Sequence, residues 1–184
     1  MWFLMEKLDW HRAGMRVLHF APELVFYDLF SSFKDIDYWS VDLNPNRYKG
    51  KVRKKVDITN IPFEDNSFDL IMCTHVLEHI PEDKKAMSEL YRVLKPKTGI
   101  ALLNVPIYKN KAVTLENPEY NTPELRSKYY GQYDHVRAYG LDYPQRLQNA
   151  GFTVYQFKLD DISQEDSKRY GINKNEKFFW SRKE

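Results

Sequence analysis

The chain alternates between short apolar segments rich in strand-forming residues and longer segments whose apolar residues follow a helical period. This alternation is typical of a parallel sheet, because each strand reaches the next through a crossover helix that packs on one face of the sheet. The segments expected to form strands are residues 16–20, 38–43, 51–57, 68–73, 100–105, 152–158 and 177–181. The sequence therefore predicts an α/β fold with a mostly parallel, seven-stranded sheet and helices on both faces.

Four segments are expected to be helices, namely residues 2–8, 22–33, 81–94 and 141–150. Two of them begin with a proline, which suits the first helical turn, and Gly151 after the last is typical of a C-cap. Residues 106–140 break the pattern and hold three prolines. An irregular insertion of this length is typical of a lid, a binding loop or a disordered segment, and it follows the fifth strand, where we expect substrate. With 184 residues, the whole chain is expected to form one domain.

Charge and cysteine content narrow the class of protein. The net charge is only +2, with 28 Lys and Arg scattered among 26 Asp and Glu, which argues against a nucleic-acid-binding face. Cys73 is the single cysteine, which excludes an internal disulfide and a multi-cysteine zinc site and fits a reducing cytoplasm. No apolar segment approaches the roughly 20 residues that span a bilayer. We therefore expect a soluble, cytoplasmic protein with no membrane partner, and its oligomeric state stays open.

Polar residues follow several of the predicted strands. Ligands of open parallel sheets bind outside the carboxyl ends of the strands, where these side chains would meet. An acid such as Asp42 at the end of the second strand can accept both ribose hydroxyls of a nucleoside, and Asp57 after the third can accept from an exocyclic amine. The residues at these strand ends are Asp42 and Leu43, Asp57 and Ile58, and Thr74 and His75. They predict a nucleoside-bearing cofactor, although each acid alone is also compatible with a helix cap or a loop residue.

The turn after the first strand contains no glycine. A dinucleotide site would need G-x-G-x-x-G there, so that the backbone can approach the pyrophosphate. The residues present are His19, Phe20, Ala21, Pro22 and Glu23. This argues against NAD or FAD and favours a cofactor without phosphate that carries a sulfonium and an amino-acid tail. The small Ala21 permits some approach, and Glu23 or His19 is placed to face the cationic end of such a cofactor.

Residues 75–79 match H-x-x-E-H, a zinc-protease pattern with His75 and His79 as ligands and Glu78 as the base. That pattern requires a long helix, whereas here it follows a buried strand and precedes Pro81. We therefore expect the segment to be a strand-to-helix turn and predict no metal site.

A second polar segment, YDHVRAY at residues 133–139, closes the insertion. Its His135, with Asp134 as the second choice, is the candidate general base, and Arg137 is a candidate clamp for an anionic group. The alternative is a surface turn in which these groups satisfy one another.

Taken in order, these segments resemble the type-11 class I methyltransferases. The likeness lies in VDL, in DITNIPFEDNSFDLIMCTHVLEHI and in ELYRVLKPKTGIALLNVPI, which are similar to that family's run from the second strand to the fifth. The segments RVLHFAPE, GQYDHVRAYG and DYPQRLQNAGF look like a bacterial subgroup in which HFAPE already replaces the glycine turn. Many members of this subgroup carry a cysteine-rich segment ahead of the domain, which this chain is expected to lack. The resemblance covers about residues 16–157.

The resemblance implies a Rossmann-like fold and S-adenosyl-L-methionine as cofactor. It implies that Asp42 holds the ribose, that Asp57 and Ile58 hold the adenine, and that Thr74 and His75 flank the cofactor. His19, Ala21 and Glu23 would occupy the positions of the family's acid and first two glycines.

The predicted function is methyl transfer from S-adenosylmethionine to a small-molecule or sugar-type acceptor. The first alternative is a methyltransferase fold that has lost turnover and serves as a binding module, which the glycine-free turn motivates. The second is the H-x-x-E-H zinc hydrolase.

Overall fold

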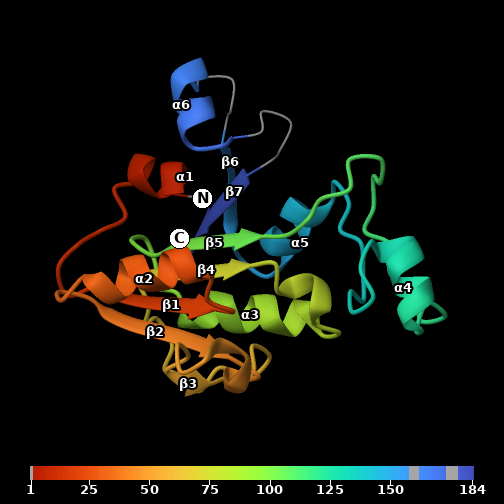
Figure 1. Ribbon diagram of the computed structural model, residues 1–184, viewed down its shortest axis with the longest axis horizontal. Helices are drawn as coiled ribbons and strands as arrows, with labels where there is room; N and C mark the ends of the chain where they lie inside the picture. Colours follow the sequence, from red (N-terminus) through yellow and green to blue (C-terminus); the bar gives the residue numbers. More distant parts are fainter. Residues whose placement is uncertain (1, 158–161, 173–177) are drawn as a thin grey trace.

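The computed structural model describes residues 2–157, 162–172 and 178–184 (Figure 1). A seven-stranded sheet in the order β3-β2-β1-β4-β5-β7-β6 forms its centre, and only β7 runs antiparallel to its neighbours. The strands are β1 Arg16–Phe20, β2 Asp37–Asp42, β3 Lys54–Lys55, β4 Leu70–Thr74, β5 Ile100–Asn104, β6 Thr153–Phe157 and β7 Phe178–Arg182. The prediction of a mostly parallel α/β sheet is confirmed.

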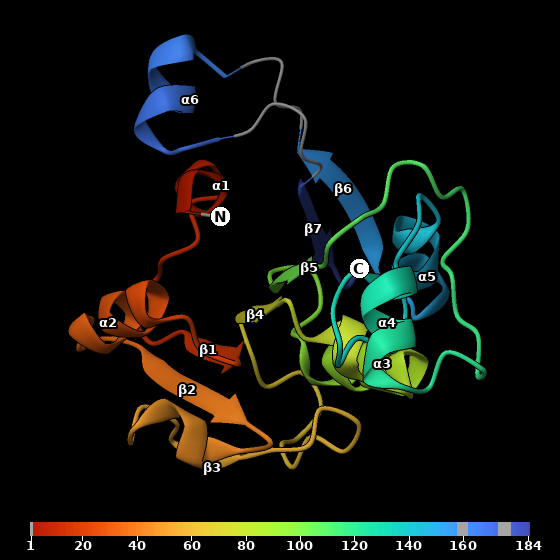
Figure 2. The ribbon, with the colours of Figure 1, turned by 45° about the vertical axis from the view of Figure 1, so that its right-hand side comes forward.

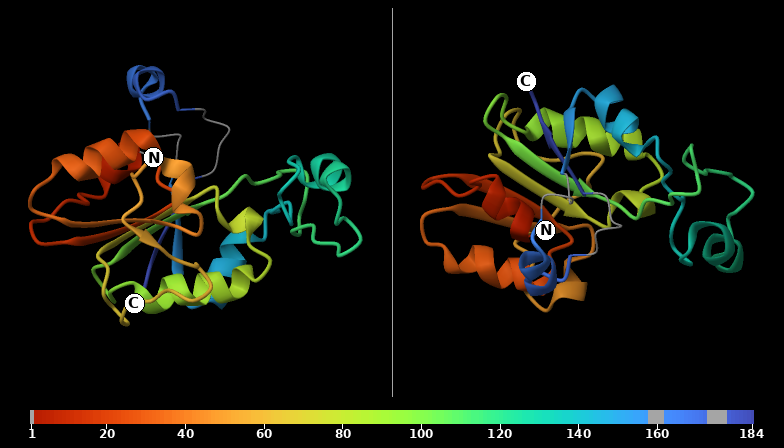
Figure 3. Two further views of the ribbon diagram at one scale, coloured as in Figure 1. Left: turned by 60° about the horizontal axis from the view of Figure 1, so that its bottom comes forward. Right: turned by 90° about the horizontal axis from the view of Figure 1, so that it is seen from above.

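Helices cover both faces of this sheet (Figure 3). They are α1 Trp2–Lys7, α2 Leu24–Ser32, α3 Asp83–Val93, α4 Pro123–Tyr130, α5 Tyr143–Asn149 and α6 Gln164–Arg169, with short 3-10 helices η1 Pro45–Tyr48 and η2 Leu77–His79. Met5 of α1 and Phe30 of α2 pack in one apolar cluster, whereas Met87 of α3 and Leu147 of α5 pack in the other. Each strand face therefore buries its apolar side chains against a different helical layer. No helix in the described ranges is both long and apolar enough to cross a membrane.

The register of the central strands brings three strand ends to one edge. Phe20 of β1 pairs with Val41 of β2 on one side and with Cys73 of β4 on the other. The next residue along each strand is Ala21, Asp42 or Thr74, so these three lie at the same edge of the sheet. This edge includes the point between β1 and β4 where the order of the strands reverses. The insertion and α4 lie beyond the same edge, to which the arrowheads of β1, β2 and β5 point (Figure 1).

Several element boundaries differ from the predicted ones. The third strand has only Lys54 and Lys55, both exposed, instead of residues 51–57, because β3 is an edge strand that covers only the end of β2. The helices predicted from residues 22 and 81 begin later, at Leu24 and Asp83, since Glu23 still has an extended backbone and Glu82 is the N-cap. Two short helices, α4 and α6, were not predicted. Residues 158 and 177, the ends of two predicted strands, lie outside the described residues.

Helix α4 lies in the insertion that the sequence suggested was irregular. Thr122 accepts a hydrogen bond from the backbone of Leu125 at its start, Pro123 occupies the first turn, and Gly131 ends it with φ +86°. These are ordinary cap residues. The helix stands away from the sheet in Figure 1, and Figure 2, in which this side of the molecule comes forward, shows it in front of α3.

Candidate active site

A cavity of about 480 Å³ opens at the carboxyl ends of β1, β2 and β4. Its walls come from the turn after β1, the segment after β2, the segment after β3, the η2 turn and the end of the insertion. The lining residues are Phe20, Ala21, Asp42, Leu43, Asn44, Arg47, Tyr48, Val56, Asp57, Ile58, His75, Val76, His79, Ile80, Gln132 and Asp134. The fold thus brings most of the predicted cofactor residues, and Asp134 of the predicted catalytic pair, around one space.

Asp42 is held in a fixed orientation at the end of β2. Its Oδ1 accepts a hydrogen bond from the backbone of Asn44 at 2.6 Å, and its Oδ2 accepts one from the Tyr48 hydroxyl at 3.0 Å. Burial and the neighbouring Asp42 raise the pKa of Tyr48 to about 12, so this hydroxyl remains a donor at neutral pH. Each carboxylate oxygen can accept more than one hydrogen bond, so both can still receive a hydroxyl from the cavity.

Asp57 and Ile58 form another part of the wall. Asp57 Oδ1 accepts from the backbone N–H and the hydroxyl of Thr59, both at 2.8 Å, and these hydrogen bonds lower the pKa of Asp57. The side chain of Ile58 is buried. A carboxylate beside an apolar surface suits a flat base with an exocyclic amine, although the Thr59 contacts also fit a plain loop turn.

Three predicted cofactor residues do not line the cavity. His19 is fully buried on the side of α2, where its Nε2 lies 2.6 Å from Glu23 Oε2 and its Nδ1 lies 2.9 Å from the Tyr38 hydroxyl. Thr74 has a buried Oγ1 that lacks a hydrogen-bond partner in the described part of the chain. The contact of His19 and Glu23 bridges the two ends of the glycine-free turn, and a direct cofactor role for these three residues stays a prediction.

Ala21 has φ +48° in this turn, a left-handed backbone that a non-glycine residue adopts at a cost of roughly 1–2 kcal/mol. Its backbone N–H donates to the Val41 carbonyl at 3.0 Å, which ties the turn to β2. The turn therefore has the backbone shape that glycine favours, without a glycine.

On the opposite wall, the insertion meets the η2 turn. His79 Nδ1 lies 3.4 Å from Asp134 Oδ2, and both residues line the cavity. Burial alone would raise the pKa of Asp134, but the hydrogen bond from Gln132 and the nearby His79 outweigh it and lower the pKa. His135 is behind them, 7% exposed, with its ring packed edge-on against His79 at 4.7 Å and its Nδ1 donating to the Tyr130 carbonyl at 3.1 Å.

The sequence placed His79 on a strand-to-helix turn and not in a metal site, and its pairing with Asp134 and His135 was missed. No local sequence pattern predicts this pairing, because it joins the η2 turn to the end of the insertion, which are far apart in the chain. The H-x-x-E-H residues lie on a turn, with His75 at φ +54°, and on the short η2, not on a long helix.

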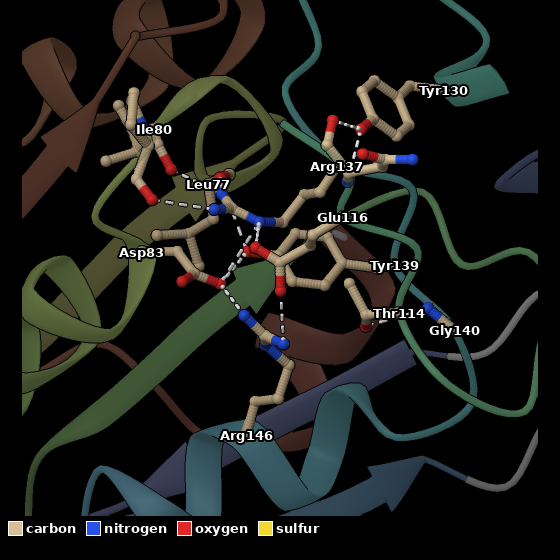
Figure 4. A network of polar contacts seen from close by, with 12 residues as sticks. Leu77, Ile80, Asp83, Thr114, Glu116, Tyr130, Arg137, Tyr139, Gly140 and Arg146 are labelled. Carbon is tan, nitrogen blue, oxygen red and sulfur yellow. Dashed lines mark hydrogen bonds and ion pairs between the residues drawn. The ribbon is translucent and has the colours of Figure 1, made fainter. Parts of the chain in front are cut away.

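A buried polar network holds the insertion in place (Figure 4). Arg137 is 2% exposed, and its guanidinium donates to the carbonyl oxygens of Leu77, Ile80 and Pro81. Arg137 Nε also donates to Glu116 at 3.0 Å, and the Tyr139 hydroxyl donates to Asp83 at 2.7 Å. Arg146 joins the two acids, because its guanidinium lies 2.8 Å from Asp83 and 2.8 Å from Glu116. These partners lie on other segments of the chain, so Arg137 is buried against neighbouring elements and does not sit in a surface turn whose groups satisfy one another.

The strand order with antiparallel β7, and a cavity at the edge shared by β1, β2 and β4, define a class I methyltransferase fold. An S-adenosylmethionine-dependent methyltransferase from Mesorhizobium loti shares it with a TM-score of 0.65 at 12% identity, over 98% of this chain and 94% of that one. Residues 20–102 match the model of the type-11 methyltransferase domain, the family that the sequence resembles. This match and the shared fold support the predicted resemblance, whereas the bacterial subgroup stays a prediction.

Two relatives match over part of their length. A protein of Methanocaldococcus jannaschii, described as uncharacterised, is 45% identical over 82 residues, which is 44% of this chain and 36% of its own length. A demethylmenaquinone methyltransferase of Lactiplantibacillus plantarum is 41% identical over 44 residues, 24% of this chain and 19% of its own length. The matches span well under half of these curated relatives.

Proposed function

We propose that the protein binds S-adenosylmethionine in the cavity above Asp42 and transfers its methyl group to a small-molecule or sugar-type acceptor. The single observation that carries this proposal is the oriented Asp42 carboxylate at the end of β2, inside a cavity of about 480 Å³ at the strand ends. Cavities of roughly 300–1,000 Å³ are typical of small-molecule and cofactor sites.

The residues present fit this cofactor. Asp42 offers two acceptor oxygens for the ribose, and Asp57 and Ile58 offer an acid and an apolar surface for the adenine. The Thr74 hydroxyl, at the end of β4, has no hydrogen-bond partner among the described residues. When bound, the cofactor supplies an electrophilic methyl group, which an acceptor atom attacks in line while the bonding pair stays on sulfur. The main task of the protein is then to hold the acceptor in attack geometry, which contributes roughly 7–11 kcal/mol to the lowering of such barriers.

A hydroxyl acceptor must also lose a proton. In our proposal His135 takes this role with Asp134 as the second choice, and His79 is added because its imidazole lines the cavity and packs against His135. An amine acceptor needs no such base, and the three residues then only position it. The demethylmenaquinone methyltransferase relative supports a small-molecule acceptor as a class without identifying it.

Isothermal titration calorimetry with S-adenosylmethionine and S-adenosylhomocysteine tests the cofactor part. We expect Asp42→Asn to weaken binding roughly 10- to 100-fold, since a hydrogen bond to a charged group contributes about 1.5–3 kcal/mol. The matched control is Asp28→Asn, an exposed carboxylate on α2 that pairs with Lys51. A folded wild-type sample that binds neither compound at millimolar concentration would overturn the proposal, and binding without turnover on any acceptor would favour the binding module.

A further inference from the structure

A cluster of two imidazoles and one carboxylate lies at the wall where the insertion meets η2. Glu78, His79 and His135 each offer one ligand atom, and these atoms lie within 4.8 Å of one another. We infer that this cluster is a binding site for a divalent transition-metal ion of the zinc class. The site differs from the H-x-x-E-H pattern, because His135 of the insertion takes part and His75 does not.

Glu78 is the residue that most requires a cation. Its side chain is almost fully buried, and its Oε2 has no hydrogen-bond partner among the described residues. Its Oε1 lies 3.3 Å from His75 Nδ1, so within the described part of the chain only one of the two oxygens has a hydrogen-bond partner. A buried carboxylate without full compensation is costly, and a bound metal ion supplies the missing positive charge directly.

The two histidines already have the outer contacts of metal ligands. His135 Nδ1 donates to the Tyr130 carbonyl, and His79 Nδ1 faces Asp134 Oδ2 at 3.4 Å. Histidines that bind metals commonly give one ring nitrogen to a carbonyl or carboxylate, which fixes the tautomer and leaves the other nitrogen for the ion. Within the described part of the chain, no hydrogen bond occupies Nε2 of either ring.

The backbone also holds the two halves of the cluster together. The Val136 backbone N–H donates to the Glu78 carbonyl at 2.9 Å, directly beside His135. The next residue of the insertion is Arg137, whose guanidinium donates to the carbonyl oxygens of Leu77, Ile80 and Pro81. Two supports therefore flank the cluster, and the ligand atoms, within 4.8 Å of one another, would close onto the roughly 2.0–2.2 Å bonds of zinc between them.

Two histidines and one glutamate leave a fourth position for a non-protein ligand. Because His79 lines the cavity, this position lies on the acceptor side. Here the inference rests on the proposed function: a metal ion at this position would bind an acceptor oxygen and lower its pKa. It would replace His135 as the activating group, since a nitrogen bound to the ion cannot also take a proton.

Zinc titration of the chelator-treated, tag-free full chain tests the site, with calorimetry and a competing chromophoric chelator as readouts. We expect one equivalent of Zn²⁺, and at least 100-fold weaker binding for His79→Gln, His135→Gln and Glu78→Gln. Asp134→Asn should weaken it roughly 10- to 100-fold, as the loss of an outer partner does. His11→Gln is the matched control, because His11 pairs with Asp35 at the opposite end of β1 and should bind like wild type.

Cobalt substitution gives a second readout that does not depend on any variant folding. Visible absorption typical of a four- or five-coordinate Co²⁺ site supports the inference, whereas a spectrum typical of hexa-aqua Co²⁺ contradicts it. The inference is overturned if no stoichiometric metal binds, if the His79→Gln and His135→Gln proteins, folded by circular dichroism, bind zinc like wild type, or if His75→Gln weakens binding as much as His135→Gln. Calorimetry of the metal-free protein with S-adenosylhomocysteine separates the two proposals: cofactor binding without zinc binding overturns the metal site alone, whereas zinc binding without cofactor binding overturns the proposed function alone.

Discussion

Arg137 is the residue on which the ordering of the insertion depends most. Its guanidinium donates to three carbonyl oxygens of the η2 region and to Glu116, with 2% of the residue exposed. Arg137→Met keeps a similar length of apolar side chain and removes every one of these donors. The change leaves buried carbonyl oxygens without donors and removes one positive charge from the Asp83 and Glu116 carboxylates.

Removing one partner of a buried ion pair costs about 3–5 kcal/mol. In a domain of this size, each 1 kcal/mol shifts the midpoint of thermal unfolding by roughly 2–4 °C. We therefore expect Arg137→Met to lower Tm by roughly 6–20 °C. Arg137→Lys should recover little of this, because an ammonium cannot reproduce the fork that reaches several carbonyls at once.

Differential scanning calorimetry and urea unfolding measure this effect. The matched control is Arg12→Met, whose exposed guanidinium makes one long contact, 3.5 Å to the Thr98 carbonyl. The control should stay within about 0.5 kcal/mol of wild type. If Arg137→Met unfolds within 1 kcal/mol of the control, the network does not hold the insertion and the reasoning is refuted.

Three further changes have defined outcomes. The Arg92 hydrogen bonds lower the pKa of Glu89 below its ordinary value of 4.5, so their contribution is present above that pH and is lost as pH falls through the lowered value. Glu89→Gln should therefore be less stable than wild type at pH 7 and lose less stability between about pH 5 and pH 3 in urea unfolding; parallel losses would contradict this. Gly140→Ala should lower stability by about 1–3 kcal/mol, because its Cβ would lie 2.6 Å from the Val113 carbonyl carbon, and wild-type Tm would exclude that clash. His135→Ala should slow transfer to a hydroxyl acceptor roughly 10²- to 10⁴-fold while cofactor affinity is unchanged, and transfer at the wild-type rate would eliminate its role.

The sheet and the cofactor wall follow from local sequence, and for that reason they could be predicted. Short apolar segments followed by Asp42, Asp57 and Thr74 predict both the strands and the polar residues at their carboxyl ends. The face of the sheet to which the His19 side chain points could also have been predicted from the sequence. Alternate residues of a strand face opposite sides, so that Phe20 in the cavity wall places His19 under α2.

The acceptor side could not be predicted in the same way. Its contacts join Glu78 and His79 to Asp134 and His135 across a long loop, and no periodicity connects these segments. Arg137 was a candidate clamp for an anionic group because its charge is evident from the sequence. The carbonyl oxygens of Leu77 and Pro81, to which its guanidinium donates, cannot be inferred from the sequence. Helix α4 is a different case, because Thr122 at its start and Gly131 at its end are local cap signals in the sequence, although no helix was predicted there.

The most direct test of the central claim is a crystal structure of the protein with S-adenosylhomocysteine. The account predicts ligand density in the cavity at the ends of β1, β2 and β4, with the ribose hydroxyls on Asp42 and the sulfur directed toward the wall of His79 and Asp134. Density that leaves Asp42 without a ribose contact, or that lies on the α2 side against His19, would contradict it.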